Sequence, residues 1–451
     1  MNDKMLLEFN KKLRVFFKEI VKIAKDIKLI KRSTNSFYNK EIDFILFIVF
    51  STFGIHNGLS LSSLSLKLYD QFGINITKQG IDFKLSEEKT VLFLKMVLDM
   101  LLKLDFNFNT GLSPDMFSSF NNILLEDSTI VMLKDELRDN YKGVLSMVSA
   151  LKVTYLYNAN FSYSNISIHD SNQNDQSLSD ENLSNFKKND LIIRDLGYYK
   201  LLILRKIMKK GVYFLSRFLY GTKIRFNLDG RTYTINEFLR KKENHGKKII
   251  EANIYLGVKE KLPVRIVAYK IPIATYKKRT YNKEKHLRNS DVISKDYKNA
   301  LRYTILITNI PEKVIEKEIL GILYKFRWQI ELVIKENKSL LKLGDISHTK
   351  NSNKVKTILY ARLIASFLIS PIKKYTSEKA VKINKELSPT KLINWLVMDK
   401  KLIECFKEQE FTTIFENINK VLKNLLKGKR KRKTMMQQIE EKIKYLNSFK
   451  T

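Results

Sequence analysis

Two aspartates lie where buried strands are expected to be interrupted or to end. Asp127 falls within the apolar run 122–133, and Asp195 closes the run 191–195. A carboxylate in such a place is costly unless it is paired or binds a metal. Two carboxylates on neighbouring strands, joined by a third from a helix, can hold two divalent ions about 4 Å apart that act on a phosphodiester. Taken alone, each aspartate is more often a turn residue or a member of an ion pair.

A helix expected within residues 313–342 supplies a candidate third carboxylate. Four polar residues recur on it at steps of three, four and seven, which stacks them along one helical face: Tyr324, Arg327, Glu331 and Lys338. On a surface helix this stripe would simply face solvent. Here the intervening residues are largely apolar, so the helix is predicted to be buried with its polar face turned into a site. A carboxylate beside Tyr, Arg and Lys offers a metal ligand and three groups suited to phosphate.

The spacing Tyr-x2-Arg-x3-Glu-x6-Lys resembles the YREK signature of the insertion-sequence-four family of bacterial DDE transposases, and all four positions match. Residues 125–129 resemble the family's first aspartate block, and residues 194–198 resemble the second. Residues 306–311 resemble the strand that precedes the signature helix. The resemblance covers roughly residues 40 to 375, and its specificity comes from the combination of these pieces in family order.

The resemblance implies an α/β fold, with a ribonuclease-H-like catalytic domain interrupted by an antiparallel β insertion and flanked by helical N- and C-terminal domains. It implies a metal-binding catalytic triad of Asp127, Asp195 and Glu331, which would hold two Mg²⁺ or Mn²⁺ ions; the chain offers no soft ligand set. It also implies three groups that would hold the DNA phosphate near the cleavage point: Tyr324, Arg327 and Lys338.

Two further residues carry open alternatives. Arg217 is similar to a family arginine that enters the site from the insertion, but it could equally be an exposed charge at a strand edge. Relatives place an aromatic residue just before the Thr-Asn strand to stack on a flipped base. This sequence departs from that pattern, because the nearest candidate is Tyr303, for which a packed strand tyrosine is the favoured reading.

The function implied is a DNA transposase that binds terminal inverted repeats, frees a 3′-hydroxyl and uses it in strand transfer. The family suggests cut-and-paste excision through hairpin ends by two subunits in a paired-end complex. One alternative is a metal-dependent nuclease or resolvase on the same fold. Another is a DNA-binding remnant with a decayed site, which the presence of all six signature residues disfavours.

The composition agrees with a nucleic-acid partner. Lys and Arg number 82 against 47 Asp and Glu, a formal net charge of +35, while 44% of the residues are hydrophobic. That much apolar material excludes a disordered basic tail protein. The basic residues are spread over every segment, which favours nucleic acid over an anionic membrane as the partner; double-stranded DNA is the nucleic acid that the resemblance implies. A single cysteine, Cys405, excludes a disulfide framework and a cysteine-rich zinc module.

No secretory signal is expected, because residues 1–40 are charged throughout. The longest apolar run, residues 44–55, is shorter than the roughly 20 residues that a membrane span needs. It is therefore predicted to be a buried helix. A cytoplasmic, nucleoid-associated protein follows.

The elements that must position these residues divide the chain into four expected parts. Residues 1–112 are predicted to form a helical DNA-binding domain, in which 64–85 could be a helix-turn-helix or an ordinary helical hairpin. Residues 113–205 and 300–372 would form the catalytic domain, and residues 206–299 a β-rich insertion. Within these parts, residues 171–185 are predicted to be a loop and 276–299 a linker. A long helix is predicted at about 354–370, ending before Pro371. Residues 373–451 would be helical and basic, with helices at 388–414 and 435–449 and an acid-free basic run at 427–433.

Overall fold

The computed structural model describes residues 3–31, 39–56, 60–103, 119–144, 147–159, 162–242, 248–285, 293–344, 346, 349–398, 412–428 and 441. The predicted helix at 435–449 and most of the basic run at 427–433 lie outside these residues. Of the predicted helix at 388–414, the part from 399 to 411 also lies outside them.

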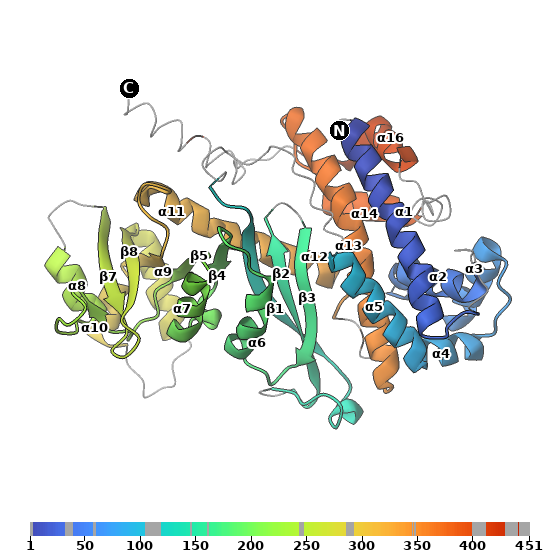
Figure 1. Cartoon of the computed structure of the whole chain (residues 1–451), viewed down its shortest axis with the longest axis horizontal. Coiled ribbons are helices and arrows are strands. Elements are labelled where there is room, and N and C mark those ends of the chain that lie inside the picture. Colours follow the sequence, from blue (N-terminus) through green and yellow to red (C-terminus); the bar gives the residue numbers. More distant parts are fainter. Residues whose placement is uncertain are drawn as a thin grey trace. The chain divides into compact units, whose positions relative to one another are not determined.

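Helices make up the first and last described parts of the chain, and the strands lie between them with shorter helices interspersed (Figure 1). The α-helices are α1 (Asp3–Asp26), α2 (Lys40–His56), α3 (Leu61–Phe72), α4 (Lys78–Ser86), α5 (Glu88–Lys103), α6 (Asp175–Glu181), α7 (Leu201–Lys209), α8 (Ile235–Lys242), α9 (Ile273–Glu284), α10 (Lys295–Ala300), α11 (Lys317–Leu323), α12 (Arg327–Ser339), α13 (Ser352–Lys382), α14 (Pro389–Met398) and α16 (Thr412–Val421). The strands are β1 (Ile123–Met132), β2 (Ala150–Asn158), β3 (Ser162–Asp170), β4 (Leu191–Arg194), β5 (Tyr213–Arg217), β6 (Ile224–Arg225), β7 (Ile249–Leu256), β8 (Leu262–Lys270) and β9 (Tyr303–Thr308).

The chain divides into two compact units, and both β1 and α12 run from one unit into the other. The first unit comprises Met1–Asn109, Ser128–Gln173 and Glu331–Lys431. The second comprises Thr110–Asp127, Asn174–Ile330 and Arg432–Thr451. The strand order is β3-β2-β1-β4-β5-β9-β8-β7-β6. Strands β1, β4 and β5 are parallel, whereas β5, β9, β8, β7 and β6 pair antiparallel.

The first unit is built around α13. Most of its side chains are buried, and it packs against α2, α4 and α5. It is long and apolar enough to meet a membrane-span test, but 83% of its most apolar window is buried inside the protein, as in a core helix. The sequence predicted that this helix ends at Ser370, and that was wrong, because the helix continues through Pro371. An interior proline costs about 3 kcal/mol, and the burial of the residues on both sides of it offsets that cost.

The second unit holds the parallel strands and their antiparallel extension. Strand β9 pairs with both β5 and β8, so the predicted β block continues the sheet through β9. Side chains extend this pairing beyond the end of β9. The Thr308 hydroxyl donates to the Phe214 carbonyl at 2.5 Å, and the Asn309 side chain accepts from the Phe214 amide at 2.7 Å. The Thr-Asn pair therefore fixes the end of β9 against β5.

Three segments differ from the sequence prediction. The expected loop at 171–185 contains α6, which is capped where Asn174 accepts a hydrogen bond from the Ser177 amide at 2.8 Å. The expected linker at 276–299 contains most of α9 and most of α10. The predicted single helix over 313–342 is divided into α11 and α12 by a 3₁₀ turn at Tyr324–Phe326.

The helix pair α3–α4 was predicted correctly. Ser60 caps the start of α3, and Gly73, with a φ of +63°, ends it in the left-handed conformation that favours glycine. Thr77 accepts from the Gly80 amide at 3.1 Å and caps α4. These caps define two short helices joined by a tight turn. Both alternatives for this segment, a helix-turn-helix and an ordinary helical hairpin, have this arrangement.

Candidate active site

Asp127 and Asp195 follow a pair of facing residues on neighbouring parallel strands. The register of β1 and β4 pairs Glu126 with Arg194. Asp127 is the next residue on β1, and Asp195 comes directly after the end of β4. The usual spacing of adjacent strands therefore puts their Cα atoms about 5 Å apart. Both side chains are partly exposed, and that of Asp195 is 44% exposed. The two carboxylates can thus reach a shared ligand from solvent.

The residues just before the aspartates point to the opposite face of the sheet, because side chains alternate along a strand. Arg194 Nη2 lies 2.9 Å from Glu126 Oε2, and the two side chains are 1% and 0% exposed. Asn182 donates to Glu126 Oε1 at 2.7 Å. Burial lowers the pKa of the Arg194 guanidinium, while the nearby Glu126 carboxylate acts in the opposite direction. This pair was missed in the sequence, although a charged residue at an inward position of each strand could have indicated it.

Tyr324 and Arg327 lie beside Asp195. Tyr324 begins the 3₁₀ turn and Arg327 directly follows it. In a 3₁₀ turn, side chains three residues apart point in the same direction. Arg327 Nε lies 3.9 Å from Asp195 Oδ1, and the Tyr324 hydroxyl donates to the Arg194 carbonyl at 3.3 Å. Burial and the charge of Asp195 raise the pKa of Tyr324 to about 12, so the hydroxyl remains a donor at neutral pH. The turn aims both side chains at the end of β4.

Arg217 and Arg279 add positive charge to the same region. Arg217 is exposed at the end of β5. Burial and the nearby charge of Arg217 lower the pKa of Arg279, and the charge of Arg217 partly opposes the rise in the pKa of Tyr324. Arg279, on α9, donates to the Tyr303 carbonyl at 3.1 Å and to Thr304 Oγ1 at 2.8 Å. The Tyr303 side chain is buried, with 8% exposed, as a packed strand tyrosine would be. Arg279 was not anticipated from the sequence.

Glu331 and Lys338 belong to the first unit, on the part of α12 that follows Ile330. Glu331 is partly exposed, and desolvation lowers the pKa of Lys338. A buried network holds this part of the helix. Ser366 donates to Asn337 Oδ1 at 2.8 Å, and the Asn337 amide donates to the Tyr163 hydroxyl at 3.3 Å. The network fixes α12 against β3 and α13.

The chemistry of the donors fits a hard divalent cation at the two aspartates. Carboxylate oxygens are the ligands that Mg²⁺ prefers, and Asp127 and Asp195 present two of them at one level of the sheet. Within the described ranges, no group of three or more His, Cys, Asp or Glu side chains is placed to hold a metal ion. The structure therefore brings together the two aspartates, while Glu331 is described within its own unit.

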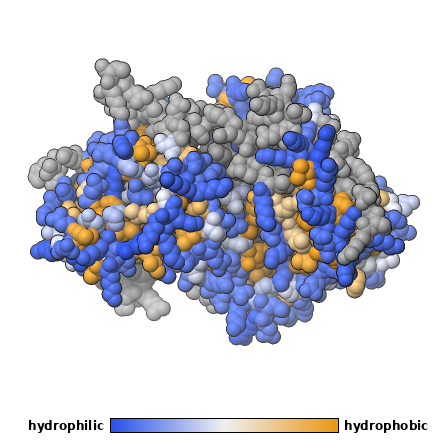
Figure 2. All heavy atoms as spheres, in the orientation of Figure 1, coloured by the Kyte–Doolittle hydropathy of each residue, from blue (hydrophilic) through white to orange (hydrophobic). Residues whose placement is uncertain are grey.

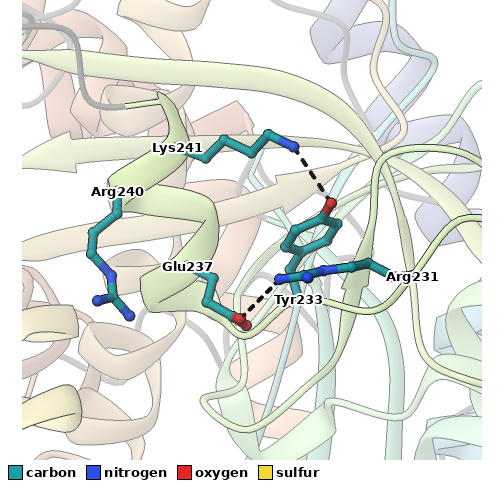
Figure 3. Close-up of a pocket in the computed structure, with 5 residues that line it drawn as sticks. All are labelled: Arg231, Tyr233, Glu237, Arg240 and Lys241. Atoms are coloured by element: carbon teal, nitrogen blue, oxygen red, sulfur yellow. Dashed lines mark hydrogen bonds and ion pairs between the residues drawn. The ribbon is translucent and has the colours of Figure 1, made fainter.

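A separate basic pocket lies at α8 and the segment that precedes it (Figure 3). It encloses a volume of about 510 Å³ and is lined by Arg231, Tyr233, Glu237, Arg240 and Lys241. Arg231 Cζ and Lys241 Nζ lie 4.8 and 5.0 Å from the centre of the Tyr233 ring. Glu237 is already engaged, because it accepts from the Thr234 amide at 2.6 Å and faces Arg231 at 3.5 Å. The pocket thus presents an excess of positive charge, which the basic run at 240–242 could have indicated in the sequence.

Comparison with known proteins agrees with these observations. A model of the transposase DDE domain matches residues 119–368, more than half of the chain. The transposase for insertion sequence element IS231F of Bacillus thuringiensis subsp. israelensis is 29% identical over 357 residues, which cover 74% of each chain. The transposase for insertion sequence element IS1151 of Clostridium perfringens is 28% identical over 454 residues, which cover 92% of each.

The family also accounts for the fold and the type of activity. A DDE domain implies a ribonuclease-H-like fold, and the strand order about the parallel strands β1, β4 and β5 is that of a mixed α/β sheet of this kind. Both aspartate blocks and the whole YREK signature fall inside the matched residues. The chain belongs to the DDE transposases of insertion sequences, a family of enzymes that act on DNA.

Proposed function

We propose that this chain catalyses both strand cleavage and strand transfer for its own insertion sequence. It binds the terminal inverted repeats, hydrolyses a phosphodiester at the element's end, and excises the element by a cut-and-paste route through hairpin ends. The observation that carries this proposal is the register of β1 and β4, which sets Asp127 and Asp195 side by side. Tyr324 and Arg327 lie beside Asp195 and Arg194, where they could bind a DNA phosphate that also contacts the metal ions.

The residues have distinct roles in the proposed reaction. Asp127, Asp195 and Glu331 would hold two Mg²⁺ ions, which when bound activate the attacking oxygen and stabilise the leaving one. Arg327 would orient the scissile phosphate, because its planar guanidinium matches two phosphate oxygens. Cleavage breaks the bond between phosphorus and the 3′-oxygen and leaves a 3′-hydroxyl. In strand transfer that hydroxyl bonds to a target phosphorus, and one target phosphodiester bond breaks.

Phosphate contacts around this centre come from Arg217, Tyr324 and Lys338 in the proposal. Tyr303 remains a candidate for stacking on a flipped base only if its ring leaves the buried position that it occupies beside β8.

The domain organisation in this proposal is the one expected from the sequence. Residues 1–112 would bind the repeats, 113–205 and 300–372 would catalyse, and 206–299 would form the insertion. Two subunits would act in a paired-end complex on double-stranded DNA, inside the cell and associated with the nucleoid. The net charge of +35 supports a DNA partner, and Figure 2 shows hydrophilic side chains over much of the described surface on the face in view.

A joining assay separates the proposal from its main alternative. The protein is incubated with Mg²⁺, a labelled linear DNA that carries the element's end, and a supercoiled plasmid. We expect the label to become covalently joined to the plasmid, since a transposase uses the freed 3′-hydroxyl as a nucleophile. Cleavage without joining would instead identify a nuclease or resolvase. End binding without cleavage would identify an inactive remnant.

The basic pocket predicts a measurable share of DNA affinity. The triple variant Arg231→Gln/Arg240→Gln/Lys241→Gln is expected to weaken end binding and to reduce the slope of log affinity against log salt by about 2 to 3, since each phosphate contact contributes about 0.9. The three side chains are exposed, so the thermal midpoint should change little. Binding is measured by fluorescence anisotropy between 50 and 200 mM salt, a range that brackets about a tenfold or larger change in affinity.

A matched variant removes the same charge elsewhere in the second unit. Lys187→Gln/Lys188→Gln/Lys209→Gln changes three exposed lysines and should leave the salt slope closer to that of the unmodified protein. Equal slopes for the two triple variants would show that the pocket has no particular role and that only total charge matters.

A further inference from the structure

The strongest unexplained feature is the buried ion pair behind the candidate aspartates. Arg194 and Glu126 are among the least exposed charged residues that the structure describes, at 0% and 1%. Removing two charges from water is expensive, and a well-packed apolar pair of similar volume would often be as stable or more so. Stability alone is therefore a weak reason for an ion pair at this position.

The Glu126–Arg194 pair has few polar partners in the core. Glu126 receives Asn182 at 2.7 Å and Ser179 at 3.5 Å, two polar residues that are themselves buried around α6. The Arg194 guanidinium stands 5.6 Å from the centre of the Phe186 ring. None of the three Arg194 guanidinium nitrogens has a partner in hydrogen-bond geometry within the described part of the chain. Glu126, whose Oε2 lies 2.9 Å from Arg194 Nη2, therefore supplies the compensating charge, and an ion pair links the two strands at this point.

The position of this contact relates it to the site. Each member immediately precedes an aspartate, and the backbone carbonyl of Arg194 is the acceptor for the Tyr324 hydroxyl. A slip of one residue between β1 and β4 would turn the aspartate of the displaced strand to the opposite face, because side-chain direction alternates along a strand. Such a slip would also separate Glu126 from Arg194 and leave the charge of the other strand unpaired in the core, at a cost of several kcal/mol.

We propose that the Glu126–Arg194 ion pair is a positioning device that locks the register of β1 against β4 and so fixes the spacing of the Asp127 and Asp195 carboxylates. The two residues touch neither substrate nor metal, and they act only through the aspartates that follow them. The inference rests on the proposed function for the identity of the ligand, a divalent cation. It goes beyond that function in assigning a role to two residues outside the signature.

The test replaces the pair by uncharged side chains without leaving a buried charge. In the double variant Glu126→Gln/Arg194→Met, glutamine can still accept from Asn182 and methionine fills most of the arginine volume. We expect the thermal midpoint and the affinity for end DNA to stay near those of the unmodified protein. The Mg²⁺ concentration for half-maximal cleavage should rise about tenfold or more, as is common when a group supporting metal ligands is lost.

A second readout needs no activity. Binding of Mn²⁺ to the DNA-free protein, followed by calorimetry, should weaken by about the same factor, since loosened carboxylates bind a cation less well. The matched control is Lys206→Gln/Asp180→Asn, which neutralises an exposed ion pair of 2.7 Å on neighbouring helices of the same unit. Its Mg²⁺ dependence and Mn²⁺ affinity should be unchanged.

The outcomes are distinct. A folded double variant with an unchanged Mg²⁺ dependence and Mn²⁺ affinity would overturn the inference and leave the pair a purely structural contact. If the double variant does not fold, Arg194→Lys keeps the buried charge but loses the planar guanidinium. It should show the same shifts to a smaller degree, and unchanged values in a folded Arg194→Lys would also overturn the inference. An unmodified protein that binds Mn²⁺ but cleaves no DNA would instead contradict the proposed function.

Discussion

Replacing Asp195 by Asn is expected to lower the rate of end cleavage in Mg²⁺ at least about a thousandfold, which corresponds to roughly 4 kcal/mol of lost transition-state stabilisation. Asparagine has nearly the same shape as aspartate but lacks the charge that a divalent cation requires. The Asp195 side chain is 44% exposed, so the fold should be unaffected. The rate is measured under single-turnover conditions on a labelled DNA end.

Asp127→Asn should give the same loss, because the register makes the two aspartates equivalent neighbours at one level of the sheet. Glu331→Ala tests the third proposed ligand in the same assay. End binding should remain within about twofold for all three variants, because the DNA affinity is attributed to phosphate contacts by basic residues. Asp229→Asn, which changes an exposed carboxylate paired with Lys261 at 2.9 Å, is the matched control and should retain full cleavage.

Retained cleavage in Asp127→Asn or Asp195→Asn would contradict the assignment of the site. Loss of cleavage together with loss of binding would indicate damage to the fold, which the thermal midpoint of each variant would reveal. Only the combination of lost cleavage and retained binding supports the proposed role of these carboxylates.

The aspartates could be recognised from the sequence because a charge inside or at the end of an apolar run is costly and therefore informative. The spacing of Tyr324, Arg327 and Glu331 could also be interpreted from the sequence, since residues three and four apart lie on the same face of a helix. The break between α11 and α12 was not. A 3₁₀ turn uses the same residues as an α-helix and differs only in its hydrogen bonds, so the apolar pattern continues through it unchanged.

Helices α9 and α6 were not predicted from the sequence, because neither carries a readable apolar pattern. Helix α9 has no buried residue, so it carries no apolar stripe from which a period could be read. Ser179 of helix α6 and Asn182, which directly follows the helix, both donate hydrogen bonds to Glu126. Glu126 is more than 50 residues away in the chain, so a sequence window around α6 does not contain it. The same limitation concealed the Glu126–Arg194 pair.

Pro371 illustrates the opposite case, in which a strong local signal is overridden. Proline cannot donate a backbone hydrogen bond within a helix and clashes with the preceding turn. The sequence therefore favoured a helix end at this point. In the structure the residues on both sides, including Ile369 and Ile372, are buried. Tertiary packing of α13 thus decides the local conformation, which agrees with the general weakness of propensity as a predictor.

The largest expected effect on stability comes from Arg265. This residue is 5% exposed, forms a hydrogen-bonded ion pair with Glu251, and donates to the Ile315 carbonyl at 2.7 Å. Arg265→Ala would leave a mostly buried carboxylate and a buried carbonyl without this partner. We expect a loss of about 3 to 5 kcal/mol, the usual cost of breaking a buried pair from one side. The measurement is the thermal midpoint, with hydrogen exchange of β7, β8 and β9 to locate the change.

The charge argument can be separated from the loss of volume. Arg265→Met keeps most of the side chain's bulk but leaves Glu251 with only the more distant Lys317, 3.4 Å away, so it should be nearly as unstable as Arg265→Ala. The double variant Glu251→Gln/Arg265→Met removes both charges and should recover part of the lost stability. If Arg265→Met were as stable as the unmodified protein, packing would account for the effect and the ion pair would contribute little.

The same substitution should also reach the site, because Glu251 ties the start of α11 to the sheet. Its second oxygen lies 3.4 Å from Lys317 Nζ, and the nearby Tyr269 hydroxyl donates to the Lys317 carbonyl. Helix α11 leads directly into the turn that carries Tyr324 and Arg327. At a temperature where Arg265→Met remains folded, cleavage should therefore fall more than end binding. Equal losses of cleavage and binding would indicate general unfolding, whereas a selective loss of cleavage would show that this anchor aims the phosphate-directed groups at Asp195.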